Sequence, residues 1–214
     1  LLEFADLFSI MKFKMFDTIC HEHLEYYSSK VIINLAKKNN LRVFDIKKNN
    51  INGSSKQFYL CHQTAVYKSN KKVINNELNI EAKSKLQKIN TFKKFEKEIN
   101  ESKIKLLDFL IEMKNKGKSV HGYGASTKGN VLLQYFGIGN DLVKYIAERN
   151  KNKFNLYTPG SKIRIISEKN SRALKPDFYL VLPWHFKKEI LIRERKIRQR
   201  GTRFIFPLPT LKII

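Results

Sequence analysis

The sequence predicts an α/β protein with a mostly parallel sheet, and the second half of the chain shows the clearest pattern. There, short apolar segments typical of buried strands alternate with helix-like segments, and the links between them are short. A glycine-containing turn follows the first of these strands and leads into a helix. Because ligands of parallel sheets bind at the carboxyl ends of the strands, a site is expected at this turn.

The first half is predicted to contain helices and one pair of strands. Ser28 and Ser29 are typical helix caps, and the cations and asparagines at 37–40 are typical of a helix end. A strong Asn-Gly turn signal lies within 49–55, so the strands on either side of it should pair or lie adjacent. The predicted elements are a helix at 1–11, a helix over 31–36, and strands at 41–46 and 57–66.

Residues 77–116 are highly charged and carry an apolar stripe at helical spacing, which predicts one or two long amphipathic helices. Gly117 is a helix stop signal directly after them. The elements predicted beyond it are strands at 119–123, 142–147, 163–166, 178–182 and 203–206, and helices at 131–136 and 187–200.

Composition argues against several classes of protein. The chain has 214 residues, 42 % of them hydrophobic, and no apolar run approaches the length of a membrane span. Cys20 and Cys61 form no C-x-x-C motif, so we expect no disulfide framework, no zinc site and a reducing, cytoplasmic compartment. The net charge of +23 is spread along the chain, which indicates solvated faces more than a nucleic-acid surface. Arginines are dense only in 187–203. A helix with this pattern could hold an anionic ligand or a partner, and the alternative is a plain exposed face.

The turn at 119–131 is the first candidate site. Gly122 and Gly124 allow a tight turn and a close ligand, the N–H groups that start the helix suit an anion, and Lys128 adds a positive charge. The dinucleotide fingerprint G-x-G-x-x-G is not matched, because the next glycine, Gly129, comes two residues late. We predict a phosphate-binding turn, and the alternative is a tight turn without a ligand.

The second candidate site is the run His21-Glu22-His23. An imidazole near its ordinary pKa of about 6.5 can take a proton at neutral pH, and a neighbouring carboxylate can orient it. The two histidines could also bind a metal, but no further ligands accompany them, so no metal site is predicted. The alternative to proton transfer is a polar surface turn.

Three stretches occur in an order that resembles one family. They are FDTICHEHLEYYS at 16–28, VHGYGASTKGN at 120–130, and LPWH at 182–185 together with FIFPLPTLK at 204–212. This set resembles the S-adenosylmethionine-dependent sugar C-methyltransferases, which act on nucleotide-linked deoxy-keto-sugars. Shorter pieces at 52–55, 148–150 and 159–160 agree with it.

The resemblance implies a longer enzyme of three domains. Residues 1–75 would be the C-terminal remnant of a Rossmann-like methyltransferase domain, 76–116 an amphipathic helical linker, and 117–214 a Rossmann-like, nucleotide-sugar-binding C-terminal domain. The S-adenosylmethionine site would lie mostly upstream of this chain, and zinc would belong only to a missing N-terminal domain. The chain alone would therefore be an incomplete methyltransferase.

The resemblance also implies roles for individual residues. His23 would be the general base that removes a proton beside the ketone, Glu22 would bind the sugar or orient the base, and His21 would support the site. Cys20 stands where the family usually has Tyr, so a phenol hydroxyl is missing there. The residues implied to hold the nucleotide-diphosphate sugar are Gly122, Tyr123, Gly124, Lys128, Asn130, Arg149, Asn150 and Trp184.

Three other functions stay open. The chain could be a non-catalytic remnant that binds a nucleotide-sugar without methylating it. It could be an NAD(P)-linked oxidoreductase domain, although the glycine spacing and the lack of an acidic residue closing the next predicted strand disfavour this. It could bind nucleic acid, which only the net charge and the arginines of 187–203 support.

Overall fold

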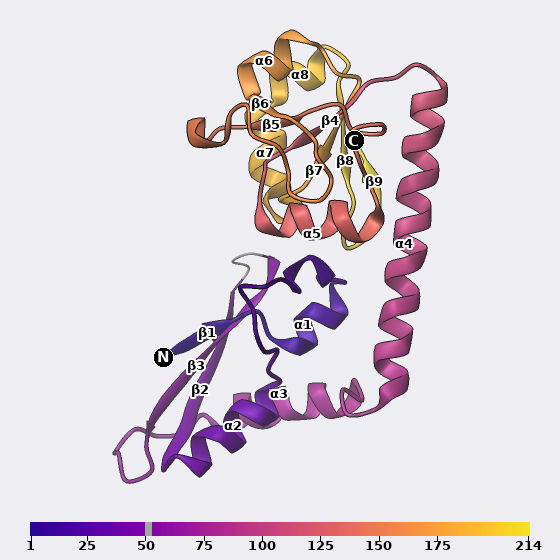
Figure 1. Ribbon diagram of the computed structural model, residues 1–214. Helices are drawn as coiled ribbons and strands as arrows, with labels where there is room; N and C mark the ends of the chain where they lie inside the picture. The colour runs from indigo at the N-terminus through magenta and orange to yellow at the C-terminus, as the bar shows by residue number, and fades with distance from the viewer. Residues whose placement is uncertain (50–52) are drawn as a thin grey trace. The chain divides into compact units, whose positions relative to one another are not determined.

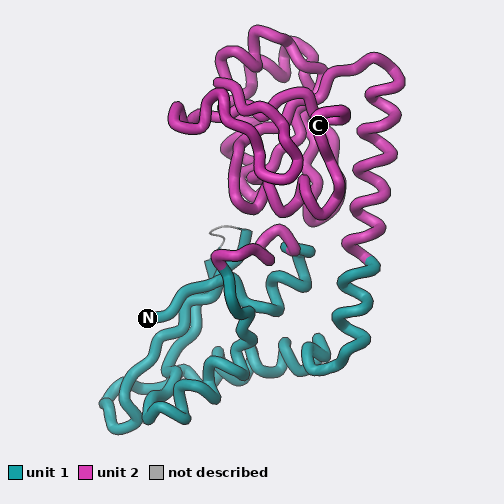
Figure 2. Tube along the Cα trace, in the orientation of Figure 1, with its two compact units in different colours: residues 1–15, 23–97 teal, residues 16–22, 98–214 magenta. Residues whose placement is uncertain are grey.

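The computed structural model describes residues 1–49 and 53–214, which form two compact units. The first unit contains residues 1–15 and 23–97, and the second contains 16–22 and 98–214 (Figures 1 and 2). One long helix, α4 (Ile89–Asn115), contributes residues to both.

The second unit contains a six-stranded sheet with the order β6-β5-β4-β7-β8-β9. All neighbouring strands are parallel except β8 and β9, which are antiparallel. The chain therefore builds outward from β4 in one direction and then returns to build in the other, which is the Rossmann-like strand order. The strands are β4 (Val120–Tyr123), β5 (Ile146–Glu148), β6 (Ile165–Ser167), β7 (Phe178–Val181), β8 (Arg203–Phe206) and β9 (Lys212–Ile213). The predicted α/β class with a mostly parallel sheet is confirmed.

Burial explains why these short segments form strands. All four residues of β4 and all four of β7 are buried, as expected for parallel strands covered on both faces. The covering helices are α5 (Thr127–Phe136), α6 (Glu168–Ala173), α7 (Lys187–Arg193) and α8 (Arg195–Gln199). The segment of residues 16–22 also belongs to this unit, and within it the Phe16 ring stacks on the Phe136 ring of α5 at a centroid distance of 5.0 Å.

The prediction of a single helix over 187–200 is wrong, because the structure has two helices there, α7 and α8. At the break Glu194 leaves helical geometry and is 2 % exposed. Its carboxylate accepts hydrogen bonds from Arg172 and Tyr123. These partners lie far away in sequence, so the helical pattern of the segment does not reveal the break.

The first unit contains a three-stranded antiparallel sheet with the order β1-β3-β2. Its strands are β1 (Leu2–Phe4), β2 (Leu41–Asn49) and β3 (Ser55–His62), and its helices include α1 (Leu7–Lys12), α2 (Ser29–Lys38) and α3 (Lys71–Lys83). The predicted strand pair is confirmed as β2 and β3. The turn predicted between them includes residues 50–52, which lie outside the described residues.

The helix predicted over 1–11 is wrong in its first part. Phe4 lies in a strand that pairs with β3, and its ring stacks on Phe58 at a centroid distance of 5.3 Å. The helix begins only after Asp6, whose side chain accepts a hydrogen bond from the Ser9 amide. Pairing with a distant strand overrides the local helical spacing here.

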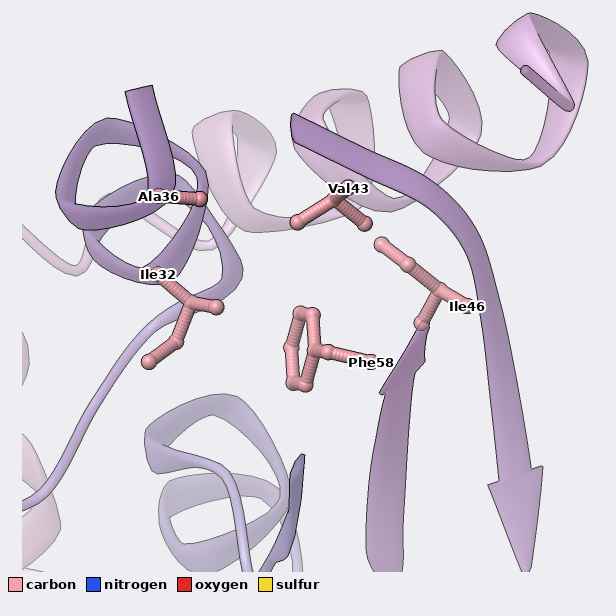
Figure 3. Close-up of a cluster of buried hydrophobic side chains, with 5 residues drawn as sticks. All are labelled: Ile32, Ala36, Val43, Ile46 and Phe58. Carbon is pink, nitrogen blue, oxygen red and sulfur yellow. The ribbon is translucent and has the colours of Figure 1, made fainter. Parts of the chain in front are cut away.

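The apolar core of the first unit lies between α2 and the β2–β3 pair (Figure 3). The side chains of α2 in this core are one helical turn apart, so one face of the helix is buried. The cluster consists of Ile32, Ala36, Val43, Ile46 and Phe58.

The highly charged middle of the chain is helical as predicted, with α3 and α4 separated by a short break. Among the helices of residues 1–49 and 53–214, none combines the length and the apolar composition required to span a bilayer.

Candidate functional site

A pocket of about 720 Å³ lies in the second unit at the carboxyl ends of β4, β5 and β7. The loops that follow these strands form one part of its wall, at 124–127, 148–150 and Pro183. Helix α7 forms another part with Phe186 just before it and Arg193 at its end. This is the edge where the strand order reverses, which is where open parallel sheets bind ligands.

Gly122 and Gly124 are required for different structural reasons. Gly124 has φ +85°, and a Cβ there would lie 2.8 Å from Pro183 Cδ, so only glycine fits comfortably. Gly122 is buried inside β4, where a Cβ would overlap the buried side chain of Ile146 on β5. Packing of this side chain over β4 therefore accounts for Gly122, whereas Gly124 shapes the pocket wall.

Glu148 holds the loops after β4 and β5 together. Its carboxylate accepts hydrogen bonds from the backbone amides of Ala125 at 2.7 Å, Arg149 at 2.7 Å and Asn150 at 2.8 Å. Lys153 adds a bond from Nζ to the Ala125 carbonyl at 2.7 Å. The prediction that no acidic residue closes the strand after the glycine turn is wrong. Strand β5 runs one residue further than its apolar pattern and ends at Glu148. In dinucleotide-binding sites an acidic residue at this place hydrogen-bonds a ribose of the ligand. Here the Glu148 carboxylate instead accepts hydrogen bonds from backbone amides of the loops.

A network of charged groups lies beside the pocket. The Tyr123 hydroxyl donates to Glu194 Oε1 at 2.7 Å and accepts from Arg193 Nη2. Arg193 Nη2 also donates to Glu168 at 2.8 Å, and Arg172 Nη2 donates to Glu194 at 2.6 Å. Burial raises the pKa of Tyr123, so its hydroxyl stays protonated and neutral. The sequence pattern does not single out Glu168, Arg172 or Glu194, since Glu168 and Arg172 lie on α6 whereas Glu194 follows α7.

Asp17 anchors the segment of residues 16–22 within the second unit. The Trp184 indole Nε1 donates to Asp17 Oδ2 at 2.8 Å, and Asp17 is 0 % exposed. Burial raises the pKa of Asp17 to about 6, opposed by the Trp184 hydrogen bond and the positive charge of Lys128. Burial lowers the pKa of Lys128, opposed by Asp17 and Cys20. Lys128 is therefore an electrostatic partner of Asp17, and Trp184 is its hydrogen-bond donor.

The structure divides the eight predicted substrate-binding residues into two groups. Those that line the pocket are Tyr123, Gly124, Arg149 and Asn150. Those that do not line it are Gly122, Lys128, Asn130 and Trp184. Asn130 lies on α5, and its buried Oδ1 has no hydrogen-bond partner among the described residues.

The three residues predicted for proton transfer are all exposed. Glu22 Oε1 accepts a hydrogen bond of 3.4 Å from the Thr127 hydroxyl, and Thr127 also lines the pocket. His21 and Glu22 belong to the second unit, and His23 belongs to the first. The structure thus brings Glu22 to the start of α5. In the described part of the chain, no group of three or more His, Cys, Asp or Glu residues could hold a metal ion.

Residues 50–209 match the family described as the C-methyltransferase C-terminal domain. The chain belongs to this family. It is also 29 % identical over all 214 residues to C-methyltransferase NovU from Streptomyces niveus, and the match covers 50 % of NovU. The chain therefore spans about half the length of the curated relative that it matches. The pocket lies within the range that matches the C-methyltransferase C-terminal domain, and the segment with Asp17 precedes that range.

The Asp17 carboxyl should make the stability of this protein depend on pH. Because its pKa of about 6 exceeds the ordinary 3.8, the folded state holds the proton more tightly than the unfolded state. The stability contributed by this group is full below pH 3.8 and falls as the pH rises through 6. Relative to Asp17→Asn, the wild type should lose about 2 kcal/mol of unfolding free energy between pH 4 and 7.

Urea denaturation of both proteins at several pH values measures this difference. Asp108→Asn, an exposed position on α4, controls for the loss of a carboxylate charge. A wild-type minus Asp17→Asn difference that stays constant from pH 4 to 7 would contradict the prediction.

Proposed function

We propose that the full-length protein is an S-adenosylmethionine-dependent C-methyltransferase acting on a nucleotide-linked deoxy-keto-sugar. The observation that carries the proposal is the match to the C-methyltransferase C-terminal domain over 50–209, a range that includes the whole pocket. The relative NovU, named a C-methyltransferase, supports transfer to carbon. The type of substrate comes from the three motifs and their order.

The chemistry of the pocket suits the nucleotide part of such a substrate. A nucleoside diphosphate is anionic at one end, and three cationic residues line the pocket: Arg149, Lys153 and Arg193. The pocket also includes Thr127, the first residue of α5, where a helix leaves backbone N–H groups for an anion. Tyr123 and Phe186 add aromatic surface for a base or sugar.

In the proposed reaction the imidazole of His23 takes a proton from the carbon beside the ketone. The C–H bond breaks, and its electron pair delocalises onto the ketone oxygen as an enolate. Glu22 orients the base or binds the sugar, and His21 supports the site. When bound, S-adenosylmethionine would supply an electrophilic methyl group to the enolate carbon, and its sulfur would keep the electron pair of the broken carbon–sulfur bond and leave as a neutral thioether. The S-adenosylmethionine site, like the zinc domain, would belong to the part of the enzyme upstream of this chain.

Calorimetry tests this proposal directly. The chain and the full-length protein are each titrated with a nucleotide-diphosphate deoxy-keto-sugar and, separately, with S-adenosylmethionine. We expect both proteins to bind the sugar nucleotide and only the full-length protein to bind the methyl donor. Binding without methyl transfer by the full-length protein would instead favour a non-catalytic remnant, and no sugar-nucleotide binding by either would refute the pocket assignment.

Lys128→Ala should weaken sugar-nucleotide binding. Lys128 lies in the first turn of α5, next to Thr127 of the pocket wall, and its ammonium is a charged donor for the substrate in this proposal, so its loss should cost about tenfold in affinity or more. Calorimetry with the full-length protein measures the change, with the exposed Lys169→Ala on α6 as the control for a lost charge. Equal affinities for wild type and Lys128→Ala would reject this role.

A further inference from the structure

Arg193 is held in place by neighbours from two other elements. Its Nη2 donates to Glu168 Oε1 at 2.8 Å and to the Tyr123 hydroxyl, and its Nε lies 3.4 Å from Glu194 Oε1. The guanidinium carbon lies 5.3 Å from the centroid of the Tyr123 ring. The side chain is still 37 % exposed and lines the pocket. Among the described residues, the hydrogen bonds of Arg193 come from Nη2 and none comes from Nη1, so the two N–H groups of Nη1 remain available.

The carboxylates that hold Arg193 are shared with a second arginine. Arg172 lies 2.8 Å from Glu168 and 2.6 Å from Glu194, so two guanidinium charges balance two carboxylate charges. Tyr123 adds no charge, because its hydroxyl is protonated. The four charges of the network therefore cancel, and of these four residues only Arg193 lines the pocket.

The remaining charges of the pocket are consistent with an anion at this place. Glu148 is one of two acidic residues in the lining, and three backbone amides surround its carboxylate. The other, Glu189, lies on α7 and is exposed. Arg149 and Lys153 add two further positive charges to that of Arg193. Among the residues that line the pocket, three positive charges therefore face two negative ones.

We propose that Arg193 binds the diphosphate of the nucleotide-linked substrate through Nη1, and that Glu168 and Glu194 are positioning residues that hold its guanidinium. This inference rests on the proposed function and adds the residue that recognises the diphosphate. The planar guanidinium suits the task because it presents paired donors in a fixed geometry to phosphate oxygens and stays charged.

Titration of the full-length protein with diphosphates and nucleosides tests the diphosphate contact. The probes are thymidine and uridine diphosphates, and thymidine and uridine without phosphate. Arg193→Gln should weaken diphosphate binding by about 10- to 100-fold and leave nucleoside and S-adenosylmethionine binding unchanged. Arg193→Lys keeps the positive charge but loses the paired N–H donors of the guanidinium, so its affinity for the diphosphates should lie between those of the wild type and Arg193→Gln. Arg195→Gln, an exposed arginine outside the pocket lining, is the matched control and should bind like the wild type.

A double-mutant cycle tests the positioning role. Glu168→Gln should weaken diphosphate binding in the wild-type background and have no further effect in the Arg193→Gln background. A purely structural role would give additive losses and would lower the affinity for nucleosides as well. Thermal denaturation of every variant verifies that it is folded. If Arg193→Gln is unfolded, the affinity of Arg193→Lys for the diphosphates is compared with that of the wild type instead.

The outcomes separate the two proposals. If the wild type binds the diphosphates and a folded Arg193→Gln binds them equally well, Arg193 does not recognise the diphosphate, although the proposed function still holds. If the wild type binds neither the diphosphates nor a sugar nucleotide, the proposed function itself fails, and this inference fails with it.

Discussion

Replacement of His23 by alanine in the full-length protein is expected to slow removal of the substrate proton by about 10²- to 10⁴-fold, the range for loss of a general base. The proton beside a ketone is acidic only because the enolate delocalises charge, and a base must still accept it. The rate is measured in deuterated water as exchange of the substrate proton with solvent, without S-adenosylmethionine. Exchange isolates the deprotonation step from the later transfer of the methyl group.

The control for this experiment is His62→Ala. His62 is an exposed histidine at the end of β3 and has no proposed catalytic role. It should exchange at the wild-type rate, and both variants should bind S-adenosylmethionine normally. An unchanged exchange rate in His23→Ala would show that another group removes the proton, and Glu22 and His21 would be the next residues to replace.

Replacement of Lys56 by methionine should cause the largest loss of stability, about 3–5 kcal/mol of unfolding free energy, the range for a buried ion pair that loses one partner. Lys56 is 1 % exposed, and its Nζ lies 3.0 Å from Asp6, 3.1 Å from Glu77 and 3.3 Å from Glu81. Burial disfavours its cation, but the charges of these carboxylates outweigh burial and raise the pKa of Lys56. Methionine would leave the buried carboxylates without this cation.

Chemical denaturation of the variant and the wild type measures the loss. Lys30→Met, an exposed lysine of α2 in the same unit, is the control and should change stability little. Adding Glu81→Gln to Lys56→Met should recover part of the loss, because it removes one of the uncompensated charges. A Lys56→Met protein as stable as the wild type would mean that packing of the methionine fully replaces the ion pairs.

Local sequence patterns predicted much of the second unit. The apolar segments that became β4, β7 and β8 are continuous runs, as required of strands buried on both faces, and the prediction of β8 has the same bounds as the strand. Two segments show the limit of such patterns. Residues 2–4 have helical spacing but form a strand, because they pair with β3. The predicted helix over 187–200 is broken at Glu194, which bonds to Arg172 and Tyr123.

The candidate site was only partly predictable for the same reason. The turn after β4 has recognisable residues, and the strand-end rule predicts a site there, where the structure has a pocket. Glu148, however, looked like the start of a loop, and Arg193 looked like one arginine among several on a helix. Their importance depends on atoms that they meet from other elements.

The sequence by itself determined the class of fold and the family, because strand–helix alternation and ordered motifs are properties of residues that are close along the chain. Only the tertiary structure decided which residues of the motifs share a pocket. Strand order places the ends of β4, β5 and β7 together. Tyr123 and Gly124 lie in the pocket wall, whereas the Trp184 indole bonds to Asp17. Such proximity results from packing between distant segments, and no short window of sequence contains it.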